Sequence, residues 1–264
     1  MYEFDFERPT SVADAVAALG TEEAQALGGG QTLIPTMKQR LAMPAKLVSL
    51  TGIAEMQGVR RNDAGELCIG GGTTHATVAR EARDAYPALA DLASHIGDPA
   101  VRNRGTIGGS LANNDPSACY PAAVLGSGAT VVTSNREIAA DDFFEGMFTT
   151  ALEDGEIITE VRFPVPEAAN YQKFEQPASR FALVGVFVAR FSGGVRVAVT
   201  GAAEEGVFRW HEAEKALSSD FGPGAVEGLS VSADGMIADL HGSAAYRAHL
   251  VGVLTKRAVA AAAG

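Results

Sequence analysis

Three glycine clusters in the first half of the sequence have the composition of ligand-binding loops: Gly28–Gly30, Gly70–Gly72 and GTIGGS at 105–110. None of them has the GxGxxG spacing of a dinucleotide-binding fold or the GxxxxGK[ST] pattern of a P-loop. After the first cluster come Gln31 and Thr32, just before a predicted helix. Bare backbone N–H groups at such a place bind phosphate oxygens.

The third cluster has a similar character. Its small residues let the backbone approach a ligand, and the hydroxyls of Thr106 and Ser110 can donate hydrogen bonds to it. Two separate loops of this kind predict a ligand with a pyrophosphate bridge. We interpret Gly70–Gly72 instead as a turn at the end of a strand.

The remaining reactive residue types do not form a catalytic or metal-binding pattern. Cys68 and Cys119 are far apart and not in a CxxC pair, so this chain's cysteines cannot by themselves hold an iron–sulfur cluster or a structural zinc. Cys119 has no evident base to activate it. His75 and His95 are candidates for a ligand contact. Thr74 is a good N-cap for the helix that His75 begins, however, and we interpret His75 as more often solvent-facing than in contact with a ligand. The other three histidines, His211, His241 and His249, lack metal-ligand spacing. The hydrolase motifs GxSxG and HExxH are absent from the sequence.

Charge and hydropathy exclude some classes of partner. The 264 residues include 21 Lys and Arg against 32 Asp and Glu, a net charge of −11 with no basic tract, which disfavours nucleic acid. The longest strongly apolar stretch, FALVGVFVA at 181–189, is about half of a membrane span. The N-terminal residues lack a hydrophobic signal region, so we expect a cytoplasmic protein without a membrane span.

Local patterns predict α+β elements that would position these loops. Helices are predicted at 11–20, at 32–42 with Pro35 in the first turn, from 75 to 96 with a break at Pro87, at 210–219 and at 243–263. Strands are predicted in EAQALGGG (23–30), which ends in the first glycine turn, at 45–50, in ELCIGGGTT (66–74), at 128–134 and at 155–166. A β-meander is predicted over 181–210, with turns at SGG (192–194) and EEG (204–206). The glycine-, asparagine- and proline-rich stretch 101–121 is predicted to be a functional loop region. Pro164 and Pro166 mark the predicted domain boundary.

Two long segments resemble the FAD-binding signatures of one family. LGGGQTLIPTMKQRLAMPAKLVSL and HIGDPAVRNRGTIGGSLANNDPSACYPA are similar to those of the flavoprotein (medium) subunits of molybdenum hydroxylases, the group of carbon monoxide dehydrogenase and xanthine dehydrogenase. Later segments, including YQKFEQPASRFALVGV, look like the same subunit, so the similarity spans nearly the whole chain. It implies a two-part FAD-binding domain of the vanillyl-alcohol-oxidase-like (PCMH) type at 1–166, divided near residue 55. A smaller α+β domain with an antiparallel sheet and helices is implied at 167–264.

The resemblance also implies FAD-contacting residues. In this sequence they are Ala26, Leu27, Gly28, Gly29, Gly30, Gln31, Thr32, Leu33, Ile96, Thr106, Ile107, Gly108, Gly109, Ser110, Cys119, Ile158 and Lys173. Gly28 replaces a common alanine and Ser110 a common asparagine. Cys119 stands where many relatives have an aspartate, and Asp115 lies four residues earlier. No catalytic residue or metal site is implied within the chain.

The family resemblance implies an electron-transfer role. A molybdopterin-containing large subunit and a [2Fe-2S] small subunit would complete a heterotrimer, and a dimer of such heterotrimers is expected. The flavin would pass electrons to an external acceptor. Docking surfaces are expected around Gly97–Asn103 and on the C-terminal helices, with Arg102 and Arg104 either beside the pyrophosphate loop or at the subunit seam. A free-standing FAD oxidoreductase and a flavin-free accessory protein are the alternatives. The substrate and the acceptor cannot be read from this sequence.

Overall fold

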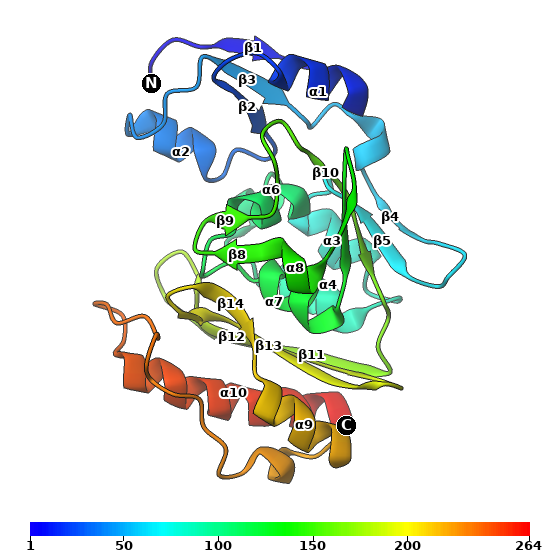
Figure 1. The fold of residues 1–264 in the computed structure, drawn as a ribbon, viewed down its shortest axis with the longest axis vertical. Coiled ribbons are helices and arrows are strands. Elements are labelled where there is room, and N and C mark those ends of the chain that lie inside the picture. The colour runs from blue at the N-terminus through cyan, green and yellow to red at the C-terminus, as the bar shows by residue number, and fades with distance from the viewer.

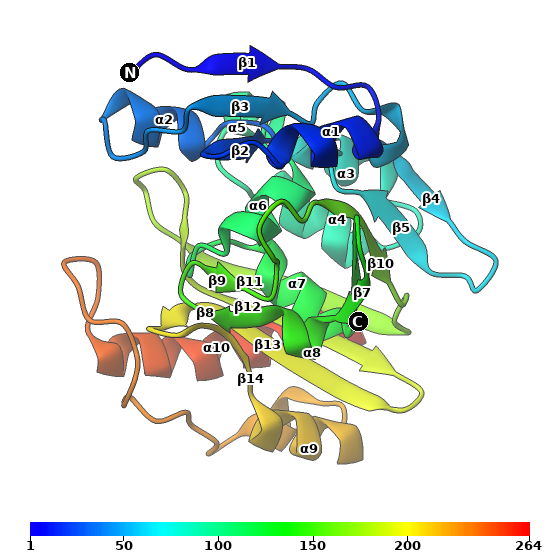
Figure 2. The ribbon, with the colours of Figure 1, turned by 45° about the horizontal axis from the view of Figure 1, so that its top comes forward.

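The computed structural model describes residues 1–264 and has the predicted α+β architecture. Three sheets are stacked as layers along the long axis of the molecule (Figures 1 and 2). The first layer is a small parallel sheet in the order β1 (Asp5–Glu7), β3 (Lys46–Ser49), β2 (Ala24–Leu27), connected by the helices α1 (Val12–Leu19) and α2 (Leu33–Lys38). The chain reaches the middle layer through a short 3-10 turn, Ala54–Met56.

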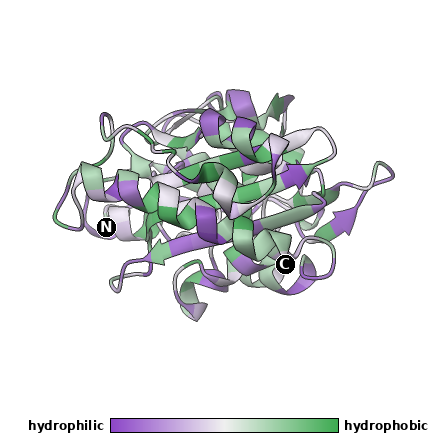
Figure 3. Cartoon of the chain, turned by 90° about the horizontal axis from the view of Figure 1, so that it is seen from below, coloured by the Kyte–Doolittle hydropathy of each residue, from purple (hydrophilic) through white to green (hydrophobic).

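The middle layer is a five-stranded antiparallel sheet with helices packed beside it. Its strand order is β4 (Val59–Arg61), β5 (Leu67–Gly70), β10 (Ile158–Phe163), β6 (Thr130–Thr133), β7 (Glu137–Ala139). The helices are α3 (His75–Glu81), α4 (Pro87–Ser94), α5 (Pro99–Arg102), α6 (Ile107–Asn113), α7 (Tyr120–Ser127) and α8 (Ala140–Phe143), followed by the two-stranded ribbon of β8 (Phe144–Gly146) and β9 (Thr149–Thr150). The hairpin of β4 and β5 projects from the body, and its outer end is hydrophilic (Figure 3).

The third layer is a four-stranded antiparallel meander with helices on both faces. Its strands are β11 (Ala168–Glu175), β12 (Ala182–Phe191), β13 (Gly194–Ala203) and β14 (Gly206–Arg209). One face packs against α9 (His211–Ser219) and α10 (Ala244–Ala263), which are joined by a segment containing the 3-10 turn Pro223–Val226. The other face packs on α4 and α7. No helix is both long and apolar enough to cross a lipid bilayer.

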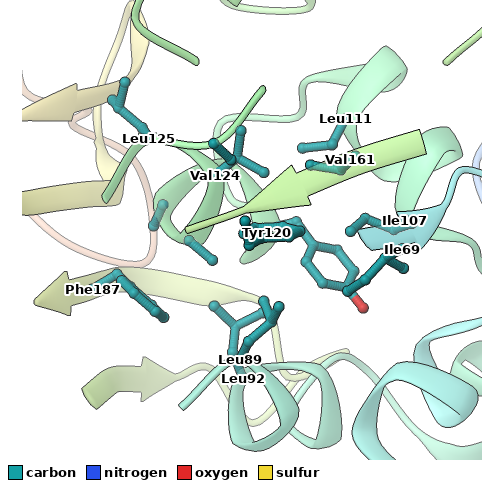
Figure 4. Close-up of a cluster of buried hydrophobic side chains, with 14 of the residues drawn as sticks. Ile69, Leu89, Leu92, Ile107, Leu111, Tyr120, Val124, Leu125, Val161 and Phe187 are labelled. Carbon is teal, nitrogen blue, oxygen red and sulfur yellow. The ribbon is translucent and has the colours of Figure 1, made fainter. Parts of the chain in front are cut away.

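The largest hydrophobic core joins the middle and third layers. Leu89 and Leu92 from α4, Val124 from α7, Val161 from β10 and Phe187 from β12 converge there (Figure 4). A second core lies between the other face of the meander and α9 and α10. Because the meander contributes side chains to both cores, it fixes the middle layer against the C-terminal helices. The boundary between the two predicted domains stays a prediction.

Most of the predicted elements are present, for the expected local reasons. Ser11 caps α1, where its hydroxyl accepts from the Asp14 N–H at 3.1 Å and donates to the Asp14 carboxylate at 2.7 Å. Pro35 lies in the first turn of α2, and Pro87 opens α4, so the 75–96 stretch is divided as predicted. The β-meander turns at the two predicted glycine-containing positions.

The prediction of a loop region for 101–121 was wrong for 107–113, whereas 103–106 and 114–119 lie outside helices and strands. The segment 107–113 is α6, capped by the Thr106 hydroxyl, which accepts from the Gly109 N–H at 3.1 Å. The helix ends at Asn114, whose left-handed backbone (φ +40°) terminates it. Gly108 is required by packing rather than by a turn, because a Cβ there would lie 2.6 Å from the Gly71 carbonyl oxygen. Helix α7 and strand β11 were also not predicted.

Candidate cofactor site

One large cavity, of about 700 Å³, lies where the small parallel sheet meets the middle layer. Its wall is built from the β2–α2 segment, the start of α6, the ends of β5 and β10, and a part of β11. Sixteen of the seventeen residues expected at the cofactor line it: Ala26, Leu27, Gly28, Gly29, Gly30, Gln31, Thr32, Leu33, Ile96, Thr106, Gly108, Gly109, Ser110, Cys119, Ile158 and Lys173. Ile107 does not line it, because its side chain is buried in the core and its N–H donates to Thr73 O at 3.1 Å.

The segment Gly28–Leu33 presents unpaired donors to this cavity. None of its six consecutive backbone N–H groups donates a hydrogen bond within the protein. Gly30 adopts φ +70°, a left-handed conformation, between the end of β2 and the start of α2. A run of free N–H groups on a cavity wall has the chemistry of a phosphate-binding loop. This is the strongest feature of the site that fits a cofactor with a pyrophosphate bridge.

The glycines of this segment also fit against the second glycine segment. A Cβ on Gly29 would lie 1.9 Å from Arg104 O and 2.6 Å from Gly105 Cα. A Cβ on Gly28 would lie 2.9 Å from Thr106 Oγ1. The two segments are therefore in direct backbone contact, and the contact itself demands glycine at position 29.

The second glycine segment offers a different surface from the one expected. Most of its amides are already used: Gly108 N–H donates to Gly71 O at 2.8 Å, Gly109 N–H to Thr106 Oγ1, and Ser110 N–H to Thr106 O at 3.0 Å. Within 105–110 only the Thr106 N–H lacks an acceptor in the protein. What remains for a ligand is the close approach that Gly108 and Gly109 permit, together with the Ser110 hydroxyl. The free donors are thus concentrated in the first segment.

Apolar and cationic groups lie on the other walls. Ile158, at the start of β10, and Ile96, after α4, contribute aliphatic side chains. Lys173 reaches across from β11, and its ammonium group donates to the His95 carbonyl oxygen at 2.7 Å. Cys119 is a free, buried thiol immediately before α7.

His75 is buried in the wall at 4% exposure and makes no side-chain hydrogen bond within the protein. Burial, helped by the positive charge of Arg102, lowers the pKa of His75 to about 4. Its ring packs against Tyr120 with the centroids 5.3 Å apart. The imidazole is therefore neutral at pH 7, and the interpretation of His75 as a solvent-facing residue was wrong.

Glu156 is a cavity residue that sequence reasoning missed. Its side chain is completely buried and accepts from Thr133 Oγ1 at 2.6 Å, from the Arg136 guanidinium and from the Glu153 N–H. Burial alone would raise the pKa of Glu156, but these hydrogen bonds outweigh burial and hold the pKa below its ordinary value. The carboxylate is a structural anchor for the segment that continues into Ile157 and Ile158.

Other wall residues were also missed. Gly71 and Gly72, which we interpreted as a simple turn after β5, do form that turn but also line the cavity. Asp115 and Ser117 lie on the same wall as Cys119, and Asp115 Oδ1 accepts from the Ser117 N–H at 2.8 Å. The Asp-Pro-Ser turn in the sequence was the available signal, since aspartate commonly accepts from the N–H two residues on. A carboxylate is thus present near the position of Cys119.

Known proteins match this chain over its whole length. Residues 2–166 match the family described as the FAD binding domain in molybdopterin dehydrogenase. The carbon monoxide dehydrogenase medium chain of Afipia carboxidovorans is 34% identical, over 97% of this chain and 95% of that one. The nicotine 6-hydroxylase medium subunit of Paenarthrobacter nicotinovorans is 35% identical, over 96% of this chain and 95% of that subunit. The solved carbon monoxide dehydrogenase of Hydrogenophaga pseudoflava superposes on it with a TM-score of 0.89 at 35% identity, covering 99% of this chain and 97% of its counterpart.

These similarities agree with the cavity and its run of free N–H groups, and they confirm the family, the oxidoreductase class and the cofactor predicted from the two signatures. The chain belongs to the family of FAD-binding medium subunits of molybdenum hydroxylases, and its cofactor is FAD.

Proposed function

We propose that this chain is the electron-transfer subunit of a molybdenum hydroxylase, taking electrons from the iron–sulfur clusters of a partner and delivering them to an external acceptor. The observation that carries the proposal is the cavity itself, with six free N–H donors in one loop. FAD bound there exchanges electrons singly or in pairs. The reductant has to be supplied to it.

Residues of the cavity are suited to hold FAD. Backbone N–H groups of Gly28–Leu33 would receive the pyrophosphate, and Ile96 and Ile158 would pack on apolar parts of the cofactor. The Lys173 ammonium adds a positive charge at the wall. We assign the sixteen lining residues predicted from the sequence to this site and leave Ile107 outside it.

The ionisable groups of the wall favour electron transfer over substrate chemistry. Glu156 is fully hydrogen-bonded, Lys173 is bound to a carbonyl, and His75 is buried and neutral. No group of three or more His, Cys, Asp or Glu side chains could hold a metal ion. The two free cysteines are separately buried, so clusters that deliver electrons would belong to another chain.

Relatives named for carbon monoxide and for nicotine are almost equally similar to this chain, at 34% and 35% identity. This supports a division of labour in which a molybdopterin-containing large subunit selects the substrate, a [2Fe-2S] small subunit relays electrons, and this chain carries the flavin. We infer a dimer of such heterotrimers. The cytoplasmic location inferred from the sequence stays a prediction.

Purification alone and with partners tests the proposal. The isolated chain should bind one FAD without a covalent bond, so acid precipitation should release the flavin into the supernatant. Substrate should bleach the flavin only in the complex with the molybdopterin and iron–sulfur subunits. Turnover of a substrate by the isolated chain at about 1 per second or faster would instead establish the free-standing oxidoreductase. A folded chain that binds no flavin would favour the accessory protein.

A further inference from the structure

A second hollow lies on the surface outside the cofactor cavity and is rich in arginine. Ala76, Ala79 and Arg80 of α3, Arg83, Ser94 of α4 and Arg102 of α5 line it. It shares no lining residue with the cofactor cavity and is open to solvent. We refer to these six residues as the arginine hollow.

The three guanidinium groups are incompletely neutralised. Arg80 pairs with its exposed neighbour Glu81 at 2.8 Å, whereas Arg83 and Arg102 have no carboxylate partner in the chain. The chain as a whole carries a net charge of −11, so these two unpaired guanidinium groups in one hollow are opposite in sign to the protein's net charge. A local positive site on an acidic surface directs where an acidic molecule can approach.

Arg102 also connects the arginine hollow to the cofactor cavity. Its Nη1 donates to Gly97 O at 2.6 Å and to Ile96 O at 3.2 Å. Together with the bond from Lys173 to His95 O, these contacts hold three successive carbonyls at the end of α4. Ile96 and Gly97 line the cofactor cavity, so the arginine hollow lies directly behind one of its walls.

We infer that the arginine hollow is a docking site for carboxylate side chains of the iron–sulfur subunit that reduces the flavin. This inference rests on the proposed function. Guanidinium groups bind carboxylates with two parallel hydrogen bonds, which fixes orientation as well as affinity. Because this chain carries a net charge of −11, a carboxylate-bearing partner is attracted to a positive site such as the arginine hollow, and this site lies against the loop at the cofactor.

Charge reversal at Arg83 tests the inference without disturbing the cavity. Arg83 is exposed and makes no bond to the cofactor loop, whereas Arg102 holds that loop and is left unchanged. Arg83→Lys keeps the charge, and Arg8→Glu is the matched control because Arg8 is exposed, unpaired and in the first layer. Each variant is produced as a tagged chain with its FAD content verified, and association with the purified iron–sulfur subunit of the same complex is followed at several salt concentrations.

Arg83→Glu should slow association by about tenfold or more at low salt, and the difference should shrink as salt screens the charges. Arg83→Lys and Arg8→Glu should associate nearly as the wild type does. If Arg83→Glu binds as fast as the wild type, with the same salt dependence, the docking site is wrong while the proposed function stands. If the wild type itself binds no iron–sulfur subunit, the proposed function fails first and the docking inference with it.

Discussion

Replacing Gly29 by alanine should weaken both the fold and the binding of FAD. The new Cβ would lie 1.9 Å from Arg104 O and 2.4 Å from Arg104 C, both backbone atoms that cannot rotate away. Since ordinary van der Waals contact begins at 3.4 Å, the two glycine segments must part by about 1.5 Å. Overpacking of this kind costs about 1–3 kcal/mol of stability.

The affinity for FAD should fall as well, because the displaced loop carries the free N–H donors. Loss of one charge-assisted hydrogen bond to the pyrophosphate, worth about 1.5–3 kcal/mol, corresponds to a decrease of about tenfold or more in affinity. Gly193→Ala is the matched control, because a Cβ at this turn between β12 and β13 meets no atom within 4 Å. Gly28→Ala should have a smaller effect, since its close contact at 2.9 Å is a side-chain hydroxyl.

Two measurements separate a packing role from a ligand role. The free energy of unfolding of the FAD-free chain reports the contact between the two segments, and flavin fluorescence quenching reports the affinity. Gly29→Ala should lower both, and Gly193→Ala neither. If Gly29→Ala lost FAD but kept the unfolding free energy of the FAD-free wild type, the glycine would serve the ligand alone and the packing argument would be refuted.

Two further predictions concern buried charged or titratable groups. Arg247→Met should lower the free energy of unfolding by about 3 kcal/mol and leave the FAD affinity unchanged. Arg247 is buried in α10 away from the cavity, donates to Leu183 O and Gly201 O at 2.7 Å each, and pairs with Asp239 at 2.8 Å. An altered FAD affinity in urea-free titrations would contradict this prediction. His75 has a folded-state pKa of about 4, below the ordinary 6.5, so it destabilises the folded state progressively as the pH falls from 6.5 toward 4. The free energy of unfolding should therefore depend less on pH over this range in His75→Asn than in the wild type. An equal pH dependence in the two proteins would show that His75 can be protonated in the folded chain.

Local sequence was sufficient to predict the elements whose stability depends on nearby residues. The capped helix at Ser11, the proline-opened helices and the strands with glycine turns are all specified within about one or two turns of chain. The two FAD signatures are also contiguous, which is why family and cofactor could be predicted. Almost every residue taken from those signatures lies at one cavity, where the fold brings the two distant signatures together.

The sequence could not predict features that depend on distant segments. The glycines of 105–110 resemble a loop, yet the tertiary structure makes them a helix, because Gly108 must pass close to the Gly71 carbonyl. Glu156 was not predicted as a cavity residue, because its burial depends on Arg136 and Thr133, which are 20 or more residues away in the sequence. Neither partner lies within a helical turn of it, so no local pattern signals the contact.

The amino-acid sequence by itself therefore determined the family and the cofactor, because these depend on short runs of residues whose types are readable locally. Only the tertiary structure decided which of the two glycine segments keeps a run of free N–H donors. It also decided that Gly29 serves the contact between the segments, and that Arg80, Arg83 and Arg102 gather at one surface. The physical reason is that folding decides which acceptors lie beside an N–H group and which charges lie beside an arginine, and most of these neighbours come from distant parts of the sequence.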